Sequence, residues 1–494
     1  MTTSSDNAFT KSVAALVARI NDVTQTKESL FEQAEVYFQG AQSQQRVILQ
    51  LTKVVEEKYK DIEAAKNVIQ RNHLRELYND AKKDLKVETA IQDRLRYVRL
   101  KCLNEVCIDI VKLCEGKNWQ ETQLKSAKVL TTLLLICPTQ GKNVAQSHQR
   151  CKPLYKAVLS LRLLDEMLAS QYVENEYIVS RYNLSSRFSK PPASFGALNL
   201  FQKDVAVPLI SAALMQDIGM QHPEIQRLLK GADGALDPYR VLEKEVRVPL
   251  LIMNHEQTIE YVSQGLGTGH FEEENDDSDD YTLRKDRFDK SESNRARLLR
   301  SMLDGAIKPK EALGSTIKAA QIYTSIVLST KPNFNFEDLP KATRVVIHSA
   351  QIGALTLNSA ESLQKIVGYF PPGFGVVFCA ANDDDNKPNE FSYGLVNTLN
   401  PIQVNEPNCL VVSSLGEIYP KGEQCTIRSQ QNLYFEQVYN QFSTLTPAIL
   451  DAVAQKIATE LDQPKNRVAI PRGWSPYSYF YFKKQQNLWV KSKD

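Results

Sequence analysis

The sequence predicts a mainly α protein that carries a small β unit near its C-terminus. All 21 prolines lie at or after Pro138, and the first 137 residues hold only Gly40 and Gly116 as glycines. Because proline breaks helix interiors and glycine weakens them, this distribution predicts long helices in the first part of the chain. Between residues 366 and 430 the pattern changes to short apolar runs separated by turn-rich segments, which is typical of strands.

The N-terminal region, residues 1–137, is expected to be a set of helices. Apolar residues recur there at the spacing of a helix face, as in Val13, Leu16 and Ile20. No fixed repeat period emerges, so a bundle, a helical-repeat array and a coiled-coil dimer all remain open, as does an extension packed on the C-terminal half. We favour a bundle used for protein contact, with homo-oligomerisation left open.

Helical spacing continues beyond the first proline. Residues 139–189 are expected to continue as helix, with further helices within 199–231 and 237–264. The stretch 272–280 holds seven acids among nine residues, and we expect an exposed loop because like charges repel one another. A calcium loop would need alternating acids, a turn glycine and a distal glutamate, and this spacing does not fit.

The C-terminal part is expected to hold strands, a helix and an aromatic tail. Strands are predicted at 376–379, 410–412 and 425–427, and a helix around 446–461. The tail interleaves aromatic and basic side chains, which suits base stacking, a protein contact or folding back on its own domain. We favour folding back. The residues concerned are Trp474, Tyr477, Tyr479, Phe480, Tyr481, Phe482, Lys483, Lys484, Trp489, Lys491 and Lys493.

Composition argues against several classes of function. Lys plus Arg number 60 and Asp plus Glu 58, so a net charge of +2 gives no global attraction to nucleic acid or anionic membranes. The strongest apolar run, 129–137, is too short to span a bilayer. The N-terminus lacks the features of a secretory signal, and the eight cysteines lack metal-type spacing. We therefore expect a cytoplasmic protein with reduced cysteines.

Two short motifs carry the most specific signal. Residues 213–220 read Ala-Leu-Met-Gln-Asp-Ile-Gly-Met, and residues 254–256 read Asn-His-Glu. Together they resemble the core of the HD-GYP family, whose members are metal-dependent cyclic di-GMP phosphodiesterases of the HD phosphohydrolase group. The resemblance implies an HD-type helical domain, and it covers residues 200–410, with a divergent stretch inside it.

The same resemblance implies that the metal site has been lost. An intact member has His-Asp at the first motif and His-His-Glu at the second, whereas this chain has Gln216 and Asn254 at two of the histidine positions. A later segment resembles the family's Ala-Asp-x-Tyr, with Gln321 where a metal-binding aspartate is expected. Amide oxygens are poorer ligands for iron or manganese than imidazole nitrogens. Only Asp217 and His255 remain at positions that match ligands.

Two further segments bear on the resemblance. The loop after the second motif lacks the Gly-Tyr-Pro signature, because Glu260 and Val262 stand where the family has glycines. Residues 363–377 include Gly-Tyr-Phe-Pro-Pro-Gly, which is similar to the end of many HD-GYP domains. We expect a remnant pocket with no catalytic residue, no metal and no cofactor. Its residues are Gln216, Asp217, His255, Glu256 and Gln321.

On this interpretation the chain has three parts. Residues 1–137 form a helical interaction region, 138–365 a degenerate HD-GYP-like domain, and 366–494 the β unit, helix and tail. The resemblance implies a catalytically inactive bacterial protein that acts through a protein partner, as a signalling adaptor or a structural component. Binding of a cyclic dinucleotide is left open.

Two other interpretations remain. The first is a working phosphohydrolase with a rearranged site, in which His222 or His270 replaces lost ligands beside Asp217, His255 and Glu256. The second is an all-α scaffold whose motif matches are accidental. In that case Asp217 is an ordinary hydrogen-bonding residue and His255 a core histidine.

Overall fold

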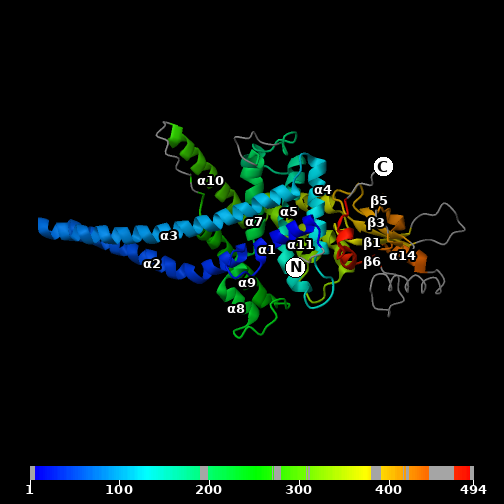
Figure 1. Ribbon diagram of the computed structural model, residues 1–494, viewed down its shortest axis with the longest axis horizontal. Coiled ribbons are helices and arrows are strands. Elements are labelled where there is room, and N and C mark those ends of the chain that lie inside the picture. The colour runs from blue at the N-terminus through cyan, green and yellow to red at the C-terminus, as the bar shows by residue number, and fades with distance from the viewer. Residues whose placement is uncertain are drawn as a thin grey trace.

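Helices make up most of this computed structural model, and a small sheet lies at one end (Figure 1). This confirms the predicted mainly α fold with a small β unit near the C-terminus. The structure describes residues 6–189, 198–269, 271, 280–307, 309, 312–379, 391–414, 417–418, 422–443 and 472–489. Nearly all of the acidic stretch and the helix expected around 446–461 lie outside the described residues. Among the described residues, no helix combines the length and apolar character that crossing a membrane requires.

Two long antiparallel helices form a hairpin that extends away from the rest of the molecule (Figure 1). Helix α2 begins after Ser29, whose hydroxyl and the side chain of Glu32 cap each other's backbone N–H groups. Helix α3 begins after Asn67, whose side chain accepts a hydrogen bond from the backbone of Gln70. We call residues 42–102 the projecting hairpin. The helices span Leu30–Ala64 (α2) and Val68–Cys114 (α3).

The other N-terminal helices pack on the body of the protein. Helix α1 contacts α5 and is capped by Asn7, whose backbone N–H also donates to Oε1 of Gln486 near the C-terminus, at 2.8 Å. Helix α4 lies between α3 and α5. The bounds are Ala8–Asn21 (α1) and Trp119–Leu135 (α4). The N-terminal region therefore combines a projecting hairpin with helices that pack on later parts of the chain.

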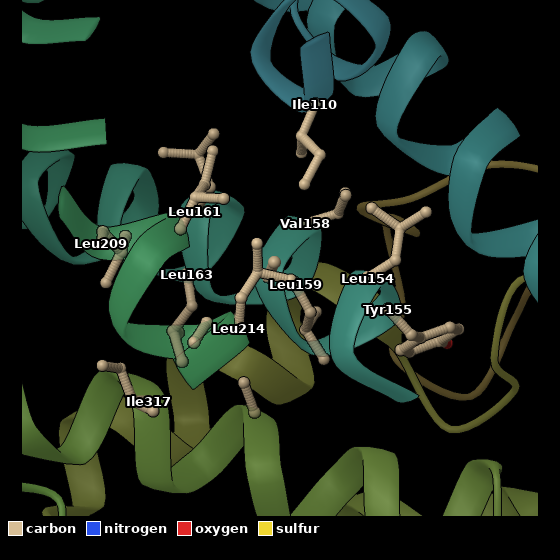
Figure 2. Packing of buried hydrophobic residues seen from close by; sticks show 14 of the residues in the cluster. Ile110, Leu154, Tyr155, Val158, Leu159, Leu161, Leu163, Leu209, Leu214 and Ile317 are labelled. Carbon is tan, nitrogen blue, oxygen red and sulfur yellow. The ribbon is translucent and has the colours of Figure 1, made fainter. Parts of the chain in front are cut away.

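Helix α5 is the centre of the fold. Its apolar side chains face in several directions and meet α3, α7 and α11 (Figure 2). The helix predicted over residues 139–189 is shorter than expected, because it ends at Ala169 and only one further turn, α6, follows. The bounds of these elements are Val144–Ala169 (α5), Glu176–Val179 (α6), Val207–Met215 (α7) and Ala312–Val327 (α11).

The remaining helices surround this centre. Two π-helical turns, η2 and η4, adjoin α7 and α9 respectively, and a short 3-10 turn, η3, follows α7. Their bounds are Gln202–Ala206 (η2), Ile218–Gln221 (η3), Pro223–Lys230 (α8), Lys244–Glu260 (α9), Tyr261–Leu266 (η4), Asp280–Gly305 (α10), Phe336–Lys341 (η5), Ala342–Gln351 (α12) and Leu357–Val367 (α13).

The C-terminal sheet is antiparallel, with strand order β4-β3-β2-β1-β6 and β5 paired to β3. The three predicted strands correspond to β1, β3 and β5, whereas β2, β4 and β6 were not predicted. The bounds are Gly375–Cys379 (β1), Phe391–Val396 (β2), Asn408–Ser414 (β3), Glu417–Ile418 (β4), Gln424–Thr426 (β5) and Gly473–Trp474 (β6). The short helical elements nearby are Ser429–Gln431 (η6), Glu436–Ser443 (α14), Tyr477–Phe480 (α16) and Lys483–Gln486 (η7).

The described part of the aromatic tail folds back on this sheet. The indole N–H of Trp474 donates to the carbonyl of Gly394 at 3.0 Å, and that of Trp489 donates to the carbonyl of Asn397 at 2.8 Å. Phe480 is buried in the same small core. Trp474 and Trp489 therefore pack against their own domain, as the favoured interpretation of the tail predicts.

Four buried charges join the end of α3 to α5 and the segment after α6. Glu115 accepts from Arg162 at 2.7 Å, and Asp165 accepts from Arg187 at 2.8 Å. Glu115 also accepts hydrogen bonds from Arg187 and, at 2.7 Å, from the side chain of Gln202 of η2. Burial raises the pKa of Glu115, but the guanidinium groups of Arg187 and Arg162 outweigh it and hold that pKa below its ordinary value.

Replacing Glu115 with glutamine should strongly destabilise the fold. The substitution leaves Arg162 and Arg187 buried with a net positive charge, which costs about 3–5 kcal/mol of unfolding free energy. Urea unfolding followed by circular dichroism measures this loss. The control is Glu224→Gln, because Glu224 pairs with Arg227 on the surface and should leave the midpoint almost unchanged. Equal midpoints for both variants would contradict this role for the buried charges.

Candidate functional site

The first motif places Asp217 immediately after α7, beside the central helix α5. The ammonium group of Lys156 on α5 donates to Oδ2 of Asp217 at 2.9 Å. The Lys156 side chain is 6% exposed, whereas that of Asp217 keeps 40% of its surface open to solvent. Lys156 and Asp217 thus form an ion pair with a buried cation and a partly exposed carboxylate.

Gln321 on α11 lies beside the same carboxylate. Its Nε2 is 3.5 Å from Oδ1 of Asp217, and its Oε1 accepts from Lys318 at 3.4 Å. The structure therefore brings together Asp217 and Gln321, two of the residues expected in the remnant pocket, although they are 104 positions apart in the sequence. We call Lys152, Lys156 and Lys318 the lysine cluster.

The lysine cluster supplies more positive charge than Asp217 can neutralise. Lys152 lies one helical turn before Lys156 on α5, and its ammonium group donates to Oγ1 of Thr330 at 3.4 Å. Burial lowers the pKa of Lys152 to about 8; Asp217 opposes this shift, while Lys156 and Lys331 add to it. Burial also lowers the pKa of Lys318.

The charge on Asp217 is stabilised by these neighbours. Burial alone raises the pKa of its carboxyl group, but the ammonium group of Lys156 outweighs that effect and holds the pKa below its ordinary value. Lys152 and Lys318 act in the same direction. Asp217 is therefore ionised at neutral pH, and lysine ammonium groups provide its counter-charge.

The two amides that stand where the resemblance expects histidines, Gln216 and Asn254, are buried. Gln216 is 9% exposed and Asn254 is 5% exposed, and within the described structure the side-chain oxygen of each lacks a hydrogen-bond partner. Helix α9 approaches η3 so closely that a Cβ atom at Gly219 would lie 2.1 Å from the carbonyl oxygen of Asn254. Only glycine fits at position 219 without a shift of the backbone.

The remaining motif residues face elsewhere. Nε2 of His255 lies 3.5 Å from Oδ1 of Asp304 on α10, and the side chain of Glu256 is exposed. Neither hydrogen bonds nor ion pairs join His255 to Asp217 in the described part of the chain. The second motif thus contributes the buried Asn254 beside η3, whereas His255 and Glu256 are not joined to the Asp217 ion pair.

His148 on α5 is a neutral imidazole in the core. Its Nδ1 lies 2.7 Å from the carbonyl oxygen of Ser329, so this nitrogen carries the proton and donates. Burial lowers the pKa of His148 to about 4, and the ring packs edge-on against Phe334. Its Nε2 has no hydrogen-bond partner among the described residues. One helical turn of α5 separates His148 from Lys152.

These side chains do not fit the iron or manganese centre of an intact HD-GYP domain. A two-metal centre needs several imidazole and carboxylate ligands around each ion. Within the described ranges, no group of three or more His, Cys, Asp or Glu side chains is arranged to hold a metal ion. At Asp217 an ammonium group already binds the carboxylate, and a cation would have to displace it. The arrangement can instead attract an anion.

The lysine cluster was not predicted from the sequence. Its only signal was the pair Lys152 and Lys156, spaced by one helical turn in a helix that is otherwise rich in apolar residues. Buried lysines are rare unless they are paired, so such a pair in a core helix is informative. The partner of Lys156 lies 61 positions away, and only the packing of α5 against α7 brings the two together.

Replacing Lys152 with methionine should stabilise the protein at neutral pH. The pKa of Lys152 is lowered from 10.5 to about 8 in the folded state, so below pH 8 its charge is kept at a cost, and we expect a gain of about 1–3 kcal/mol. As pH rises from 8 to 10.5, the folded state loses this proton before the unfolded state does, and the wild type should approach the variant. Urea midpoints at pH 7 and pH 10 measure both effects.

Lys365→Met is the matched control for this experiment. Lys365 is mostly exposed and pairs with Glu166 at 2.6 Å on the surface, so its loss should give no comparable gain at neutral pH. If Lys152→Met were less stable than the wild type at pH 7, the charge of the partly buried Lys152 would not be a cost to the folded state.

Comparison with protein-family models, with curated proteins and with solved structures found no match for this chain.

Proposed function

We propose that this chain is a catalytically inactive HD-GYP-like protein that acts through protein contacts, as a signalling adaptor or a structural component. In this proposal the helices around α5 keep the scaffold of an HD-type domain. The projecting hairpin provides the surface for a protein partner. Hydrolysis has been lost together with the metal ligands.

One observation carries the proposal. The carboxylate of Asp217, at the position that matches the family's metal-binding aspartate, is bonded to the ammonium group of Lys156 at 2.9 Å. Lysine supplies a fixed positive charge but has no open coordination position, so it cannot acidify a water molecule as a bound metal does. In this proposal the ion pair gives Asp217 a counter-charge without the chemistry that a metal ion would supply.

The projecting hairpin supports a role in protein contact. Ala65 is its only buried residue, and its helices carry apolar side chains that are exposed to solvent. Four of them, Val87, Ile91, Leu95 and Val98, recur three or four positions apart along one face of α3, and contiguous exposed apolar surface is typical of interaction sites. The exposed apolar side chains are Val47, Leu49, Val54 and Tyr59 on α2, and Val68, Ile69, Leu77, Val87, Ile91, Leu95 and Val98 on α3.

The lysine cluster bears on the question of a cyclic dinucleotide. Three ammonium groups beside one carboxylate leave an excess of positive charge, and lysine is a common partner of phosphate in proteins. Binding of a phosphodiester without hydrolysis is compatible with this chemistry. We include it in the proposal as a ligand that the inactive centre would retain.

A rearranged phosphohydrolase is less well supported. His255 pairs with Asp304 on α10, and His222 accepts a hydrogen bond from the backbone of Glu224 and stacks edge-on against Phe38. Replacement ligands would have to meet strict geometry beside Asp217. His270 lies outside the described residues.

The purified protein should contain far less than one ion of iron or manganese per chain. The protein is expressed in medium supplemented with both metals, and its metal content is measured by mass spectrometry after gel filtration. Dialysis against each metal should give the same result, because Lys156 competes for the carboxylate. A content of about two ions per chain would refute the proposal.

Wild-type protein and Asp217→Ala should be equally inactive toward cyclic di-GMP in the presence of Mn²⁺. The reason is that the carboxylate is engaged by lysine and positions no nucleophile. Formation of the linear dinucleotide is followed by chromatography. Turnover by the wild type that disappears in Asp217→Ala would favour the rearranged enzyme instead.

A further inference from the structure

A cavity of about 630 Å³ lies between α3, α7, η4 and α10, away from the lysine cluster. Its volume is in the range of small-molecule binding sites. None of the lysine-cluster residues lines it. The floor is apolar and includes Leu103 of α3, Val207 of α7, Leu266 of η4 and Leu299 of α10.

Cationic side chains outnumber acidic ones around the cavity. Five cationic side chains line it, against the two acids Asp93 and Glu292. Three of the cations are in ion pairs: Arg295 with Asp204 and Glu292, Arg96 with Asp93, and Arg300 with Asp304. Within the described structure, Lys203 and Arg297 form no ion pair. The five cations are Arg96, Lys203, Arg295, Arg297 and Arg300.

Hydrogen bonds hold one wall of the cavity in place. Nη2 of Arg96 donates to the carbonyl of Ser263 at 3.2 Å, and Nε of Arg99 donates to the carbonyl of Gly265 at 2.7 Å. Gly267 has a φ of +71°, and a Cβ atom there would lie 2.9 Å from Nε of Arg96. Glycine therefore lets this loop close against α3, and the wall is preformed.

Both π-helical turns of the described chain border the cavity. Lys203 belongs to η2, whereas Val262 and Ser263 belong to η4. Such turns are rare, because they widen the helix at a cost in hydrogen-bond geometry, and they occur frequently at functional sites. Their position here is a second observation that points to the same cavity.

We propose that this cavity binds a small organic anion with an apolar body. The apolar floor would bury the body, and Lys203 and Arg297, which have no acidic partner in the described structure, would engage the anionic head. A carboxylate on an acyl chain and a phosphate on a nucleoside share this chemistry. The site is independent of the proposed function, because it uses neither Asp217 nor the lysine cluster.

Isothermal titration calorimetry of the full-length protein tests the proposal with three probes: decanoate, AMP and decylammonium. At least one anion should bind with one site per chain, and decylammonium should bind far more weakly because the rim is cationic. Binding of decanoate alone would identify an acyl ligand, and binding of AMP alone a nucleotide. The proposal fails if neither anion binds, or if decylammonium binds as tightly as they do.

Variants locate the bound anion. The double substitution Lys203→Gln and Arg297→Gln should weaken binding about tenfold or more, because it removes both unpaired charges from exposed positions. Lys290→Gln on the same helix as Arg297 is the matched control and should bind like the wild type, since Lys290 does not line the cavity.

A filled cavity provides the second test. Ala296 lines the cavity on α10, and Ala296→Trp should abolish binding by occupying the space of the ligand. Thermal unfolding of each variant checks that it is folded. If Ala296→Trp does not fold, the double charge variant still tests the proposal. Unchanged affinity in the double charge variant, or in a folded Ala296→Trp, would place the anion elsewhere and overturn the assignment.

Discussion

Helix α5 carries charged side chains into the centre of the protein, and each of them needs a partner there. An isolated charge in the interior costs several kcal/mol, so the fold must provide counter-charges around this helix. Arg162 meets Glu115 from the end of α3, Asp165 meets Arg187, and Lys156 meets Asp217 after α7. These pairs fix how α3 and α7 lie against α5.

Much of the fold could be predicted from local patterns. The absence of proline before residue 138 indicated the long helices, and apolar runs indicated three of the strands. Two features were not predicted. The projecting hairpin turns at a break of three residues between α2 and α3, and its only local signal is Asn67, which caps α3. Strand β6 has two residues, and it is set by tertiary contact because Gly473 and Trp474 pair with Val376 and Gly375 of β1, far earlier in the chain.

The candidate site was predicted less completely than the fold. The motifs located Asp217 and Gln321, which the structure brings within 3.5 Å of each other. They also located His255, but α9 directs it toward Asp304 on α10. The lysine cluster was not predicted because lysine is normally a surface residue. Only the burial of these lysines, which the sequence does not give, distinguishes them from surface residues. The motifs therefore identified two residues that lie close together, but they gave no indication of the lysine side chains around them.

In our proposal, the ammonium group of Lys156 pairs with Asp217 at the place where an intact HD-GYP domain would bind a metal ion. Crystals grown with Mn²⁺ and measured at the manganese absorption edge test it most directly. We predict that Lys156 Nζ lies beside the Asp217 carboxylate, at about the 2.9 Å of this structure, with no anomalous peak at that position. A manganese peak within about 2.2 Å of either carboxylate oxygen, with Lys156 displaced, would contradict it.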